Sequence, residues 1–156
     1  MARNPRPRQL FALVAWLLFC SLAHAGAWDF NSFGNDSALD WVENELKPEG
    51  MRAVEQTVAR VAGSKDYLDV DAGSYAIAAA EVLAAVQGRP AANLPEPITA
   101  TIKRLPKKVS ETMRQNARKA LDRVLADDSE LNDLWKENKD AYAAWRKSVE
   151  DIKARL

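Results

Sequence analysis

Apolar residues recur at helical spacing along most of the chain after residue 25, and no stretch alternates like a half-buried strand. The pattern predicts helices over about residues 36–47, 49–62, 74–87, 98–105 and 110–126. From Leu131 to Leu156 the same spacing indicates one long helix, or two helices broken near Lys139 and Asp140. We therefore expect an all-α protein, a single compact irregular helical bundle.

Capping and breaking residues suggest where the first helices begin and end. Asp36 or Ser37 is suited to cap the first helix, and Pro48 is expected to end it because proline cannot donate a backbone hydrogen bond. Gly63 is expected to cap the second helix, since glycine is favoured at that position. Residues 64–73 are expected to form a polar connection.

Residues 1–25 have the pattern of a secretory signal peptide. They contain three arginines and no acid, an apolar run from Leu10 to Leu22, and the sequence Ala23-His24-Ala25. The run is too short, and wrongly flanked, for a membrane-spanning helix. We expect cleavage between Ala25 and Gly26, export to the periplasm or the medium, and a mature domain over residues 26–156 with no transmembrane segment.

Cleavage would remove the only cysteine, Cys20, and the only histidine, His24. The mature chain could then form no disulfide, no Ser-His-Asp or Cys-His catalytic group and no histidine or cysteine metal site, and we expect no cofactor. It would hold 19 basic and 22 acidic residues, a net charge of −3. This acidic balance and the predicted export argue against nucleic acid as a partner.

The charges are unevenly distributed. Residues 29–81 contain eleven acids and four bases, whereas residues 103–123 contain two acids and eight bases, including Arg114 and Arg118. One interpretation is that these segments face each other or are solvated on opposite helix faces. The other is that residues from Lys103 to Arg123 form a basic stripe that docks on an acidic protein partner.

Two groups of residues could form a site. Asp36 and Asp40 lie four apart, with Asp29 upstream, and could bind a cation or act in acid–base catalysis, although helix capping by Asn35 and Asp36 is the favoured interpretation. The tryptophans could line a cleft for sugars or peptides, but a chain without disulfides favours their use in the core. Those of the mature chain are Trp28, Trp41, Trp135 and Trp145.

The start of the predicted mature chain resembles a bacterial family, the domain of unknown function 4259. Gly26-Ala27-Trp28 is followed after four residues by Phe33, Asn35, Asp36, Ala38, Asp40 and Trp41 in the spacing F-x-N-D-x-A-x-D-W. The resemblance extends through the alanine-rich segment around Glu81 and through residues 129–135 to Trp145. Residues 29–32 stand where members usually have glycines. The resemblance implies a fold and a residue pattern but no activity.

We expect a non-catalytic, exported interaction protein. The alternative is a carboxylate-based or cation-dependent hydrolase that uses Asp29, Asp36, Asp40 and Glu81. Glu81 interrupts the otherwise apolar helix 74–87, which should be central in the bundle. A buried carboxylate needs a partner, and we expect it to be the indole of Trp28 or the free amine of Gly26, so that Glu81 is structural.

Overall fold

The computed structural model describes residues 30–156, and the predicted signal peptide and its cleavage site lie outside this range. The regular secondary structure of the described chain is helical. This part of the chain has no strand and only an isolated bridge between Leu68 and Ser129. The predicted all-α fold is therefore confirmed. None of the helices within residues 30–156 is both long and apolar enough to cross a bilayer.

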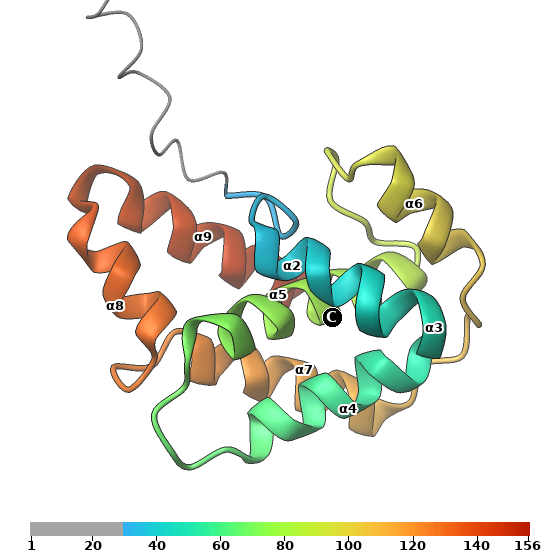
Figure 1. Cartoon of the computed structure of the whole chain (residues 1–156), viewed down its shortest axis with the longest axis horizontal. Helices are drawn as coiled ribbons and strands as arrows, with labels where there is room; N and C mark the ends of the chain where they lie inside the picture. The colour runs from blue at the N-terminus through green and yellow to red at the C-terminus, as the bar shows by residue number, and fades with distance from the viewer. Residues whose placement is uncertain (1–29) are drawn as a thin grey trace, which may run out of the picture.

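Helix α5 (Val70–Val86) is the centre of the fold (Figure 1). It contacts α2 (Asp36–Trp41), α4 (Met51–Gly63), α6 (Glu96–Lys103), α7 (Glu111–Val124), α8 (Glu130–Glu137) and α9 (Lys139–Arg155). Its residues are buried on every side from Ala76 to Val86. A helix without a polar face is stable only inside such a shell, and its alanines let the neighbouring helices approach closely.

The first helical stretch continues past the proline that was expected to end it. It passes from α2 through a π-helical turn, η2 (Val42–Leu46), into α3 (Lys47–Glu49), so Pro48 lies inside the stretch. The N–H of Lys47 donates to the carbonyl of Val42, five residues back, and this wider turn precedes the proline. The chain turns instead at Gly50, whose φ of 62° favours glycine.

Helix α5 begins four residues earlier than the sequence pattern predicts. Asp69 caps it, accepting a hydrogen bond of 2.8 Å from the N–H of Ala72. Gly73 therefore lies inside the helix and does not precede it. A Cβ at Gly73 would lie 3.2 Å from Leu131, so the glycine permits the close approach of α8.

The other boundaries follow the predictions more closely. Ser64, one residue after Gly63, is the C-cap of α4, and Ser110 caps α7 through the N–H of Met113. The C-terminal region forms two helices, because Asn138 ends α8 and caps α9 through the N–H of Ala141. The break thus falls at Asn138, beside the predicted position.

Candidate functional site

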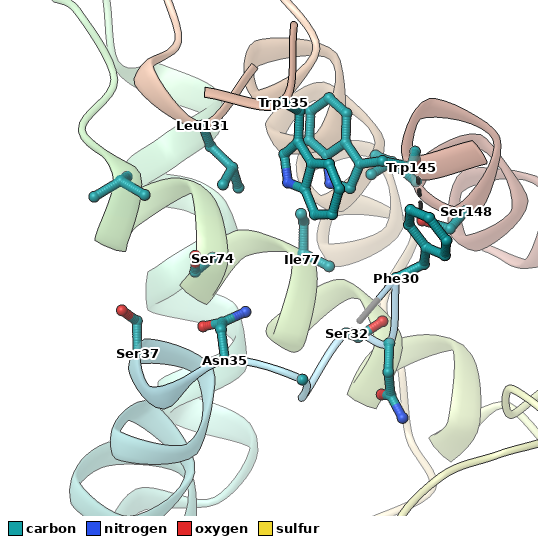
Figure 2. Close-up of a pocket in the computed structure, with 14 residues that line it drawn as sticks. Phe30, Ser32, Asn35, Ser37, Ser74, Ile77, Leu131, Trp135, Trp145 and Ser148 are labelled. Atoms are coloured by element: carbon teal, nitrogen blue, oxygen red, sulfur yellow. Dashed lines mark hydrogen bonds between the residues drawn. The ribbon is translucent and has the colours of Figure 1, made fainter. Parts of the chain in front are cut away.

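A pocket of about 360 Å³ opens between the segment before α2 and helices α5, α8 and α9 (Figure 2). We call it the aromatic pocket, because Phe30, Trp135 and Trp145 form one of its walls. The other lining residues are Asn31, Ser32, Gly34, Asn35, Ser37, Val70, Ser74, Ile77, Leu131, Ser148 and Val149.

The rings of the aromatic wall pack against one another. The centroids of Trp135 and Trp145 lie 5.5 Å apart with nearly parallel planes, and that of Phe30 lies 5.6 Å from Trp135. Tyr142 extends the stack behind Trp145 at 6.0 Å. Trp41, Trp135 and Trp145 are all buried, as expected for core residues, and the last two also line the pocket. Trp28 lies outside the described residues.

No residue that lines the aromatic pocket within the described chain has an ionisable side chain. Asn35 is the N-cap of α2, and its Oδ1 accepts the N–H of Ala38 at 2.8 Å. Ser37 donates to Asp71 at 2.6 Å, and Ser148 donates to the carbonyl of Trp145 at 2.7 Å. Ser74 is only 4 % exposed, and its hydroxyl has no hydrogen-bond partner among residues 30–156. The polar groups of the pocket are therefore neutral amides and hydroxyls.

Glu81 is completely buried, and its charged partner among the described residues is Arg155. Two guanidinium nitrogens of Arg155, at the end of α9, donate to the two carboxylate oxygens at 2.9 and 2.6 Å. The backbone N–H of Ala91 adds a bond of 2.9 Å. The segment before α2 contributes the hydroxyl of Ser32 at 3.5 Å. The proposed donors on Gly26 and Trp28 lie outside the described residues.

Arg155 is the residue that sequence reasoning missed, because 74 positions separate it from Glu81. The hydrogen bonds to Glu81, followed by those to Asp151, raise the pKa of Arg155 above its ordinary value. Its other contacts are Asp151 at 2.8 Å and the carbonyl of Arg89, also at 2.8 Å. The only local signal is that Arg155 follows the inward-facing Ile152 by three positions, which places both on one face of α9.

The predicted carboxylate cluster is not assembled in a cavity. Asp36 and Asp40 are exposed and line neither the aromatic pocket nor a second pocket of about 540 Å³, which Glu81 lines beside Asp151 and Arg155. Asn35, and not Asp36 or Ser37, supplies the cap of α2. Asp29 lies outside the described range, within which no group of three or more acidic side chains is placed to hold a metal ion.

The basic segment, residues 103–123, has few ion pairs. Arg114 pairs with Glu111 and Arg123 with Asp128, and no ion pair joins the segment to residues 30–81. Hydrogen bonds from Arg114 are the main reason why the pKa of Glu111 is lowered. Within the described chain, the bases of the segment without an ion pair are Lys103, Arg104, Lys107, Lys108, Arg118 and Lys119.

The fold and the pocket together define a small helical protein with a central alanine-rich helix and a neutral, aromatic-walled cavity. The model of one family, Domain of unknown function (DUF4259), matches residues 26–148, and the chain belongs to this family. No curated protein and no solved structure matches the chain.

Proposed function

We propose that this protein is an exported, non-catalytic binding protein whose basic segment docks on an acidic partner protein. The observation that carries the proposal is the set of basic side chains without an ion pair between Lys103 and Lys119. Cations that are not neutralised locally create a positive potential that attracts an acidic surface and speeds its association.

Three features favour this part of the surface. Lys103, Arg104, Lys107 and Lys108 are all exposed at the end of α6 and in the loop that follows it. Arg114 and Arg118 are four residues apart on α7 and therefore lie on one face of the helix. The acidic residues 30–81 form no ion pair with the segment, which leaves its charge available to another molecule.

The placement of the carboxylates favours binding over the alternative, a hydrolase. Glu81 lines a second pocket, beside Asp151, but two guanidinium nitrogens of Arg155 already hold both of its carboxylate oxygens. A carboxylate mechanism needs two available carboxyl groups across an open cleft. Asp36 and Asp40 line neither pocket, and the two carboxylates of the second pocket are both paired with Arg155.

Charge reversal at Lys107, Lys108 and Lys119 tests the docking surface. All three are exposed and make no ion pair, so their change to Glu should leave the fold intact. We expect association with a captured acidic partner to slow by roughly tenfold, because charges at the rim of an interface act mainly on the association rate. The measurement is partner capture from a cell extract, followed by binding kinetics at several salt concentrations.

The matched control reverses three exposed bases outside the segment, Arg60, Lys65 and Lys139, and so changes the net charge equally. This control should keep the partner at nearly the wild-type rate. A partner that both triple variants retain equally, or lose equally, would show that the basic segment is not the docking surface.

Export is part of the proposal and has its own test. The family match begins at residue 26, the residue that is expected to follow the signal peptide, which supports cleavage between Ala25 and Gly26. We expect N-terminal sequencing of the protein from the periplasm or medium to begin Gly-Ala-Trp. A sequence that begins at Met1 would overturn export, and one that begins at Cys20 would indicate a lipoprotein.

A further inference from the structure

We infer that the aromatic pocket binds a neutral aromatic ligand that carries a single hydrogen-bonding group. This inference does not depend on the basic segment or on an acidic partner. It rests on the aromatic wall, on the neutral lining and on one buried hydroxyl.

The hydroxyl of Ser74 is the strongest indication of a ligand. Ser74 is more than nine-tenths buried and lines the pocket, and its oxygen has no partner among residues 30–156. Figure 2 shows it on α5, between Leu131 and Asn35. The Ser74 oxygen is not one of the fully enclosed atoms of the described chain that lack a partner, so it is accessible from the pocket, where a ligand can hydrogen-bond with it.

The wall indicates what the rest of the ligand should be. Trp135 and Trp145 are stacked with centroids 5.5 Å apart, and the ring of Phe30 is tilted by 33° against Trp135 at 5.6 Å. A further ring placed in the pocket would add a contact of the same kind, which aromatic pairs favour beyond the burial of apolar area. Ile77 and Leu131 complete an apolar lining.

The charge of the pocket lining and the size of the pocket narrow the class of ligand further. A carboxylate, phosphate or ammonium would lose its hydration in the pocket, and the lining has no side chain of opposite charge to compensate within the described chain. A sugar would bring several hydroxyls, whereas Asn35, Ser37 and Ser148 of the lining are already hydrogen-bonded within the protein. A volume of about 360 Å³ suits a two-ring compound.

The test uses 2-naphthol, 2-methylnaphthalene and 2-naphthoate, which share one ring system and differ in the polar group. We expect 2-naphthol to bind best and to raise the melting temperature of the purified protein, because a ligand of the folded state stabilises it. Methylnaphthalene should bind roughly 2- to 12-fold more weakly, since it cannot bond to Ser74. Naphthoate should bind weakest of the three.

Replacing Ser74 with alanine separates the hydrogen bond from the pocket's shape. Ser74→Ala should weaken the binding of 2-naphthol by the same factor and leave the binding of 2-methylnaphthalene unchanged. Without a ligand, the variant should melt no lower than the wild-type protein. Ser148→Ala is the control in the same pocket. Its hydroxyl hydrogen is already donated to Trp145, so 2-naphthol should bind this variant as it binds wild type. The variant in which Lys107, Lys108 and Lys119 are changed to Glu should also bind 2-naphthol as the wild-type protein does.

Several results would overturn the inference. They are the absence of binding of every naphthalene probe at about 1 mM, equal binding of 2-naphthol to Ser74→Ala and wild type, and preference for naphthoate. Binding of N-acetylglucosamine in place of 2-naphthol would overturn the aromatic class. None of these results bears on the acidic partner, so the two proposals can fail separately.

Discussion

Arg155→Ala is expected to lower the free energy of unfolding by about 3–5 kcal/mol. The substitution leaves the carboxylate of Glu81 inside the core with one backbone N–H and one hydroxyl, and without an opposite charge. A buried ion without its counter-ion is far less stable than the pair or than an apolar replacement of both. Urea denaturation followed by circular dichroism measures the change.

Two further variants distinguish the buried charge from simple loss of packing. Changing both Glu81 and Arg155 to Leu removes the charges together and should recover most of the lost stability. Asp151→Ala removes only the exposed partner of Arg155 and should cost less than about 1 kcal/mol, as other surface ion pairs do. If the double variant unfolds as easily as Arg155→Ala, the ion pair is not the cause.

Trp41→Ala is the other substitution with a large expected effect, a loss of about 3–5 kcal/mol. Trp41 is 1 % exposed, and its indole N–H donates to the hydroxyl of Thr57 on α4 at 3.0 Å. The ring therefore fixes the first helical stretch against α4 through both packing and a buried hydrogen bond. Thermal and urea denaturation would measure the loss.

The hydrogen bond can be separated from the ring by a double-mutant cycle. Thr57→Val keeps the shape of the side chain but leaves the indole N–H without its acceptor, at a cost of about 1–3 kcal/mol. In a Trp41→Phe background, where the ring has no donor, Thr57→Val should lower the free energy of unfolding by less than it does in the wild-type protein. Leu39→Ala, at a position 43 % exposed on α2, should have little effect. Additive losses in the cycle would exclude the bond as a source of stability.

The sequence pattern predicted the helices well because each has a periodic apolar face, apart from α5, which is apolar on all sides. Its errors lie where a distant contact overrides a local preference. Gly73 is a helix breaker by propensity, yet it lies in α5, where a Cβ would crowd Leu131 at 3.2 Å. Pro48 is accommodated because the preceding turn widens.

In the candidate sites, too, features that depend on neighbouring residues were predictable, and those that depend on distant contacts were not. Capping by Asn35 and the burial of Glu81 follow from neighbouring residues and were predictable. The pocket was not predictable, because its wall joins Phe30 to residues of α8 and α9 more than a hundred positions away. The pairing of Glu81 with Arg155 depends in the same way on how the last helix docks.

The contact between Glu81 and Arg155 also determines when, during synthesis of the chain, the core around α5 can be completed. Helix α5 is complete at Val86, but the cation that neutralises its buried carboxylate lies at the end of α9. A growing chain cannot form this pair until Arg155 has left the ribosome. Until then α5, the most apolar helix, lacks its contacts with the end of α9. This part of the core therefore cannot be completed before α9 has been synthesised. Such a delay would suit the export that we propose, in which the chain crosses a membrane before it folds.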